Sequence, residues 1–306
     1  MNRSKKLIPL LFLVSTIPQV AYAESMGSFE EITALAEQGD AKAQLELGQI
    51  YDVGDDLAED NVKAVKWFKK AADQGNAEAQ YELALMYDNG EGVEQDYTKS
   101  FELYKTSAEQ GHAPAQYNLG VCYDDGEGVE QDYEKAAHWY LKAAEQGDID
   151  SQYNLGLLHE EGDGVEQSFS KAAEWYLKAA EQGDAFAQYN LGILYDDGNG
   201  VPQDKKLAAM WYAKAAEQGD SDAQFNLAVC YDEGEGVPLD DKKAVYWYTQ
   251  SADQGDSDAQ YNLALMYLHG EGTKQNKNKA IELLKLSAEQ GDEDALEELK
   301  ELNIEL

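Results

Sequence analysis

The chain has 306 residues, and 60 Asp and Glu stand against 24 Lys and Arg, which gives a formal net charge of −36 at pH 7. Such a charge repels phosphate backbones and anionic lipids, so the composition argues against nucleic acid and membrane surfaces as partners. Basic partners are the natural complement, although excess carboxylates can also serve only to keep an extended protein soluble.

The first 23 residues predict a cleaved secretory signal peptide. Residues 3–6 supply a basic start, residues 7–17 an apolar stretch, and residues 21–23 an Ala-Tyr-Ala cleavage site. The apolar stretch is shorter than the roughly 20 residues that a membrane-spanning helix needs. Cleavage after Ala23 leaves 24 − 3 = 21 basic against 60 acidic side chains, a formal charge of −39. We expect a periplasmic or secreted protein without membrane insertion.

The rest of the chain is periodic. A Gln-Gly pair recurs every 36 residues without an insertion, beginning at Gln38, Gln74, Gln110, Gln146, Gln182, Gln218, Gln254 and Gln290. A fixed period of this size indicates a stack of identical supersecondary units rather than one globular core.

The third unit shows how each repeat is built. Apolar residues at helical spacing predict a first helix over residues 113–124. A loop at residues 125–129 follows, whose glycines can adopt the positive φ of a sharp turn. Asp132 then caps a second helix through Glu145, and Gly147 is expected to end it in the left-handed conformation.

Small residues indicate where these helices approach one another. The first helices carry Gly or Ala at one position: Gly48, Ala84, Gly120, Gly156, Gly192, Ala228 and Ala264. The second helices carry Ala at the matching position, with Ser100 as the exception. Because one repeat cannot bury both of its apolar stripes, neighbouring repeats must stabilise one another.

The recurring string Ala-Gln-Tyr-Asn-Leu-Gly-x-x-Tyr, then Gly-x-Gly-Val, then Lys-Ala-x-x-Trp-Tyr-x-Lys-Ala-Ala-x-Gln-Gly resembles the Sel1-like repeat, a relative of the tetratricopeptide repeat. The resemblance covers residues 39–290 as seven repeats. It implies an all-α, right-handed α-solenoid of stacked antiparallel helix pairs, with residues 24–38 as an N-terminal half-repeat helix and residues 291–306 as a capping helix.

Catalytic and metal-binding signatures are nearly absent from the sequence. Ser168 and Lys171 fit the Ser-x-x-Lys motif of β-lactamases, an activity assigned to some Sel1-like proteins, but the companion Ser-Asp-Asn and Lys-Thr-Gly strings are missing. Ser168 also occupies the helix-cap position that Asp132 holds. Acidic loops such as residues 124–127 lack the regular ligand series of a calcium site. We therefore expect no catalytic residue, metal or cofactor.

Two cysteines, Cys122 and Cys230, occupy the same position three repeats apart. With helices packing roughly 8–10 Å apart, the two positions should be on the order of 30 Å distant. A disulfide needs Cα atoms within about 7 Å, so we expect two small buried apolar residues instead.

If the first helices line the inner wall, as in tetratricopeptide relatives, their remaining polar positions face a partner. One row is Asn118, Asn154, Asn190, Asn226 and Asn262. A second row, at the helix ends, is Asp124, Glu160, Asp196 and Asp232. Asparagine can bond an extended peptide backbone, although neighbouring repeats can equally satisfy it. Phe186 occupies a position where an acidic residue is usual. It is either a hot spot for binding a partner or a local contact to Tyr153.

These features predict a monomeric, non-enzymatic scaffold or adaptor that binds a basic or extended protein segment on an acidic concave face. The resemblance implies adaptors and regulators of envelope complexes, or secreted factors that engage host proteins. The alternative is an envelope enzyme acting on peptidoglycan or β-lactams.

Overall fold

The computed structural model describes residues 29–54 and 60–306. Within these ranges the chain forms sixteen α-helices and no strand, so the all-α solenoid expected from the period is confirmed. The predicted signal peptide, residues 1–23, lies outside the described residues, as does the start of the predicted half-repeat at residues 24–28.

The helices alternate between the two types expected in each repeat. Those of the first type, called helix A, are α3 (Ala41–Val53), α5 (Ala77–Asn89), α7 (Ala113–Asp125), α9 (Ile149–Glu161), α11 (Ala185–Asp197), α13 (Ser221–Glu233) and α15 (Ser257–His269). Those of the second type, called helix B, are α4 (Asn61–Ala72), α6 (Tyr97–Glu109), α8 (Tyr133–Glu145), α10 (Phe169–Glu181), α12 (Lys205–Glu217), α14 (Asp241–Asp253) and α16 (Lys277–Glu289). The series begins with α2 (Phe29–Glu37) and ends with α17 (Glu293–Glu301).

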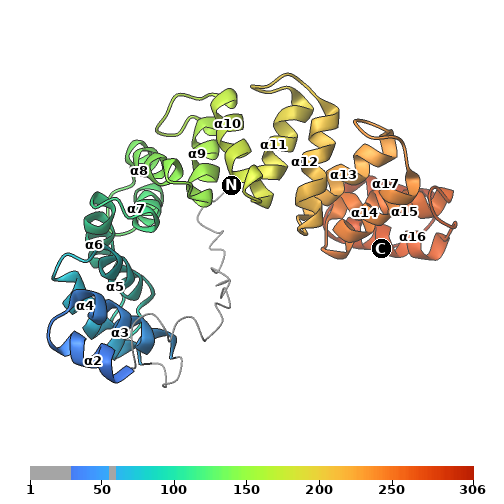
Figure 1. Cartoon of the computed structure of the whole chain (residues 1–306). Helices are drawn as coiled ribbons and strands as arrows, with labels where there is room; N and C mark the ends of the chain where they lie inside the picture. The colour runs from blue at the N-terminus through green and yellow to red at the C-terminus, as the bar shows by residue number, and fades with distance from the viewer. Residues whose placement is uncertain (1–28, 55–59) are drawn as a thin grey trace. The chain divides into compact units, whose positions relative to one another are not determined.

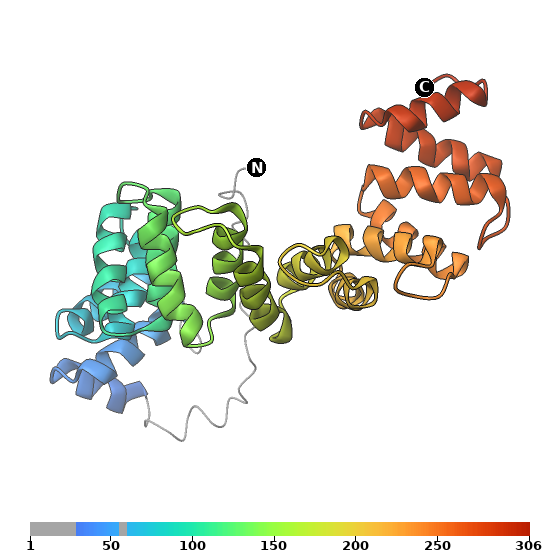
Figure 2. The ribbon, with the colours of Figure 1, turned by 90° about the horizontal axis from the view of Figure 1, so that it is seen from above.

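The chain divides into two compact halves. The N-terminal half runs to residue 151 and includes residues 163–165, and the C-terminal half comprises residues 152–162 and 166–306. In the N-terminal half, α3 packs on α4, α5 on α6 and α7 on α8, and each pair packs on the next (Figure 1). In the C-terminal half the same order continues from α10 to α17 (Figure 2).

The helix ends follow the capping residues of the sequence. The Asp132 side chain accepts a hydrogen bond of 3.0 Å from the backbone N–H of Lys135, which starts α8. Gly126 ends α7 with a φ of 77°, and Gly147 follows α8 with a φ of 97°. All three predicted roles are confirmed, and they explain why the repeat keeps its length.

The Gln-Gly period has a physical origin in the seams between repeats. The buried Gln116 of α7 donates from Nε2 to the backbone oxygen of Ala108 at the end of α6, at 3.1 Å. Its Oε1 in turn accepts from Nε2 of Gln146, at 2.7 Å. The same side-chain pair recurs as Gln44–Gln74, Gln80–Gln110, Gln152–Gln182, Gln188–Gln218, Gln224–Gln254 and Gln260–Gln290. A buried amide needs hydrogen-bond partners, so both glutamines of each repeat are required.

The small positions bring helix A against a large ring of helix B. A Cβ added at Gly120 would lie 2.6 Å from the ring of the buried Tyr140, and one at Gly192 would lie 2.6 Å from Tyr212. At these two positions the tyrosine ring leaves no room for a Cβ unless the ring shifts. Cys122 and Cys230 are free and buried, as expected.

Candidate functional site

The asparagine row lies on helix A, and all five side chains are half-buried. Each asparagine follows a half-buried aromatic residue and precedes a fully buried leucine. Burial raises the pKa of Tyr81, Tyr153 and Tyr189 to about 12, and a hydrogen bond with an asparagine of the next helix A opposes this rise. The asparagines concerned are Asn118, Asn190 and Asn226. Neighbouring repeats thus hold these amides, the second of the two roles weighed from the sequence.

A hydrogen bond to tyrosine uses only part of the hydrogen-bonding capacity of an asparagine, because the amide has two donor hydrogens and an acceptor oxygen. The row therefore combines positions fixed by the fold with remaining capacity to bond a peptide backbone. Whether a partner uses this capacity stays a prediction.

The acidic row is joined to helix B by buried tyrosines. The Tyr140 hydroxyl donates to Asp124 at 3.1 Å, that of Tyr176 to Glu160 at 2.5 Å, and that of Tyr248 to Asp232 at 3.3 Å. A fourth bond joins Tyr104 to Asp88 at 3.4 Å. These acids are half-buried, and burial raises the pKa of Asp232 and of Asp88. A partner would meet carboxylates held in fixed places.

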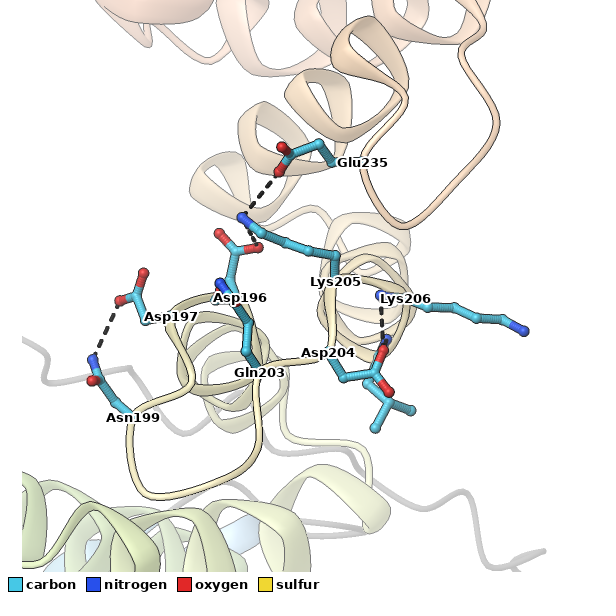
Figure 3. A network of polar contacts seen from close by, with 9 residues as sticks. Asp196, Asp197, Asn199, Gln203, Asp204, Lys205, Lys206 and Glu235 are labelled. Atoms are coloured by element: carbon cyan, nitrogen blue, oxygen red, sulfur yellow. Dashed lines mark hydrogen bonds and ion pairs between the residues drawn. The ribbon is translucent and has the colours of Figure 1, made fainter.

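Asp196 departs from this arrangement. Its Oδ1 lies 2.9 Å from Nζ of Lys205, and the same ammonium lies 3.0 Å from Oε2 of Glu235 in the loop after α13 (Figure 3). Hydrogen bonds to these two carboxylates raise the pKa of Lys205, so the ammonium remains charged at neutral pH. Lys205 therefore links the fifth repeat to the sixth.

This ion pair borders a cavity of about 110 Å³ in the C-terminal half, whose walls include Asp196 and Asn226 from the two predicted rows. Lys205, Tyr212, Glu233, Glu235, Val229 and Cys230 complete its lining. Burial raises the pKa of Cys230 to about 12, so little of its thiol is ionised at neutral pH and it reacts slowly. Sequence reasoning missed Lys205 and Glu235. The available signal was that Lys205 directly follows the cap residue, whereas Lys135 stands three residues after its cap.

Phe186 packs against Tyr153, with ring centroids 6.1 Å apart and ring planes at 41°. The local contact weighed from the sequence is therefore present. Phe186 stays half-buried, and a role as a hot spot stays a prediction.

The first two repeats carry a carboxylate where later repeats carry the asparagine, a difference that sequence reasoning also missed. Glu46 and Glu82 occupy these positions of α3 and α5, 72 and 36 residues before Asn118. Burial, followed by the charge of Asp52, raises the pKa of Glu82 to about 7. Burial also raises the pKa of Glu46, whose Oε2 is buried without a hydrogen-bond partner among the described residues. The polar row thus begins with two poorly solvated acids.

Ser168, the candidate nucleophile, has a structural role among the residues that the structure describes. Oγ of Ser168 accepts from the backbone N–H of Lys171 at 3.4 Å, which makes Ser168 the cap of α10.

No group of three or more His, Cys, Asp or Glu in the described ranges is arranged to hold a metal ion. None of the helices that the structure describes is long and apolar enough to cross a membrane. A larger hollow of about 880 Å³ between the loops near Leu239 and Thr273 contains none of the predicted site residues.

Stacked helix pairs with polar rows along helix A define the class, an all-α repeat solenoid. The chain belongs to the Sel1 repeat family, whose model matches residues 41–76, 77–112, 113–148, 149–184, 185–220, 221–256 and 257–292. Proteins built from Sel1 repeats are generally protein–protein interaction scaffolds, and the fold is typically non-catalytic.

Two solved structures are similar over most of the chain. The c5321 protein of uropathogenic Escherichia coli, a protective antigen with an SLR fold, is 42% identical with a TM-score of 0.84. The match covers 88% of this chain and 57% of c5321, so this chain spans little more than half of that protein. A Sel1 repeat protein of Oxalobacter formigenes is 38% identical with a TM-score of 0.70, over 89% of this chain and 79% of that protein. The search of curated proteins gives no match.

Proposed function

We propose that this chain is a monomeric scaffold of the periplasm or the extracellular space that binds a basic or extended segment of a protein partner along its helix A face. The observation that carries the proposal is the pair of half-buried rows, asparagine and carboxylate, which recur on successive helices A in a chain with a net charge of −36. Surfaces that are rigid before binding lose little entropy when a partner docks.

The location is supported by the sequence of residues 1–23, which has the order of features of a signal peptide. It is also supported by the similarity to c5321, a protective antigen, because antigens that protect are accessible to antibodies. A mass spectrum of the chain expressed in a Gram-negative host tests this part. An N-terminus at Glu24 in the periplasmic fraction is expected, and an intact Met1 in the cytoplasm would contradict it.

The partner is to be captured from an envelope extract at low and at high salt, and the captured protein studied by surface plasmon resonance. Asp222 and Asp258 are exposed acids on α13 and α15, so Asp222→Lys with Asp258→Lys should lower the association rate. Glu181→Lys with Glu217→Lys makes the same charge change at exposed ends of helix B. This control pair should leave the association rate nearly unchanged.

A second variant tests the contacts of the bound partner, which affect the dissociation rate rather than the association rate. Asn190→Ala should speed dissociation of the partner, since the amide would bond the bound backbone. Thermal melting of each variant shows whether it is folded. If the helix B pair has the larger effect, or if neither pair nor Asn190→Ala changes binding, the helix A face is not the binding surface.

A further inference from the structure

The fifth repeat differs from its neighbours in where its lysine lies. In five other repeats a lysine three residues after the cap of helix B lies over a tyrosine ring of helix A in the same repeat, with Nζ 4.6–5.2 Å from the ring centroid. In the fifth repeat that position is Leu207, and Lys205 directly after the cap reaches Asp196 and Glu235 instead (Figure 3).

This change pairs the usual acceptor of a buried hydroxyl with a lysine. Tyr104, Tyr140, Tyr176 and Tyr248 each donate to the acid at the end of their own helix A. Tyr212, which is only 2% exposed, lines the cavity, whereas Asp196 at the end of its own helix A pairs with Lys205. Because Tyr212 lines the cavity, its hydroxyl can form a hydrogen bond with a ligand that enters it.

The size and charge of the cavity limit what that ligand can be. Pockets for small molecules usually measure about 300–1,000 Å³, so a cavity of about 110 Å³ admits the end of one side chain rather than a metabolite. Three carboxylates, those of Asp196, Glu233 and Glu235, line it against the single ammonium of Lys205. The excess of negative charge favours a cationic group.

We propose that this cavity between α11, α12 and α13 is a subsite for the guanidinium group of an arginine in the protein partner. The inference deepens the proposed function and rests on it. A guanidinium presents five N–H donors in a plane, which suits several separated acceptors better than a compact ammonium does. Its acceptors here are the three carboxylates and the phenol oxygen of Tyr212, while the arginine backbone would lie near Asn226.

The test uses the two cysteines of the full chain and needs no identified partner. Cys230 lines the cavity, and Cys122 occupies the equivalent position of α7 outside it. Both thiols are nearly buried, and burial raises the pKa of each to about 12, so they react under similar constraints. Labelling by methyl methanethiosulfonate is followed by peptide mass spectrometry, with acetyl-arginine amide or its uncharged analogue acetyl-citrulline amide present.

We expect acetyl-arginine amide to slow labelling of Cys230 but not of Cys122, and acetyl-citrulline amide to slow neither. Lys205→Gln removes the competing cation and should strengthen this protection about fivefold, the size expected for one unit charge at contact distance in water. Such a gain cannot arise from misfolding. Tyr212→Phe should weaken the protection about tenfold, and Tyr248→Phe in the next repeat should leave it unchanged.

Three outcomes would overturn the subsite. They are equal slowing of both cysteines, equal slowing by the citrulline compound, or loss of protection in Lys205→Gln. If one of these is seen while Asp222, Asp258 and Asn190 variants still alter partner binding, the proposed function stands without the arginine subsite. If those variants also leave binding unchanged, both proposals fail.

Discussion

The two halves of the chain use one 36-residue pattern but differ at two of its positions. In the N-terminal half the polar row begins with Glu46 and Glu82, whereas the C-terminal half has asparagine in every repeat of this row. In the N-terminal half the lysine three residues after each helix B cap closes a contact within its own repeat, as Lys135 does with Asp132 at 2.8 Å. In the C-terminal half Lys205 joins two repeats.

The difference shows that packing and recognition are carried by separate positions of the repeat. The glutamine pairs and the small-residue positions that form the seams recur in both halves. The positions that vary are half-buried and lie beside the seams. A solenoid can therefore change its surface repeat by repeat, because each repeat contacts only its neighbours.

The largest effect is expected at Glu82, where Glu82→Gln tests the cost of burying the acid. Its folded pKa of about 7 lies above the usual glutamate value of 4.5, so the folded state holds the proton more tightly and the free energy of unfolding falls as pH rises between these values. Glutamine has no charge to desolvate. At pH 8 the variant should gain about 1–3 kcal/mol, less than the roughly 3 kcal/mol that the full pKa shift represents.

The measurement is urea denaturation of the full chain at pH 5.5 and pH 8. The gain of Glu82→Gln should shrink at the lower pH, where the wild-type carboxyl is largely protonated. Glu109→Gln, on the exposed end of α6, is the matched control and should change stability little at either pH. A gain that is the same at both pH values would show that the acid is not the cause.

Packing should be equally tight in both halves, which Gly120→Ala and Gly192→Ala test. Each added methyl meets a buried tyrosine ring at 2.6 Å. Overpacking costs about 1–3 kcal/mol, and the better helix propensity of alanine returns up to about 1 kcal/mol. We expect a net loss of about 1–2 kcal/mol for each variant, measured by thermal melting. A higher melting temperature for either variant would mean that the ring moves aside freely.

Tyr140→Phe and Tyr212→Phe compare how much the tyrosine hydroxyl stabilises a repeat when the acid of that repeat accepts from it and when that acid pairs with Lys205 instead. Tyr140→Phe removes a hydrogen bond to Asp124 and should cost about 1 kcal/mol. Tyr212→Phe removes a hydroxyl whose usual acceptor, Asp196, pairs with Lys205, and should change stability by less than about 0.5 kcal/mol. Equal losses in melting temperature would show that Tyr212 is bonded in solution.

The smallest effects are expected for the lysines. Lys135→Met removes a well-exposed ion pair and should hardly change the melting temperature, because such pairs are screened by water and salt. Lys205→Met removes two pairs at a less exposed site and should cost about 0.5–1 kcal/mol. Both losses should shrink in 1 M NaCl. A larger loss for Lys135→Met would contradict the assignment of Lys205 as the link between repeats.

Much of this protein followed from the sequence alone. The period, the glycines at fixed positions and the capping aspartates predicted helix pairs whose ends agree with the structure to about a residue, as in α7 and α8. These features act through neighbours close in the chain, where spacing fixes which side chains meet. The burial of Cys122 and Cys230 followed in the same way, since one helical position has the same surroundings in every repeat.

Only the tertiary structure decided how the polar rows are bonded. Asp124 accepts from Tyr140, sixteen residues later, whereas Asp196 pairs with Lys205 instead. The second arrangement depends on how α11, α12 and α13 pack together. The cavity beside Tyr212 and the poor solvation of Glu82 have the same origin. Distances between side chains of different helices, and the water that packing removes, are properties of the assembled seam, and the one-dimensional pattern does not contain them.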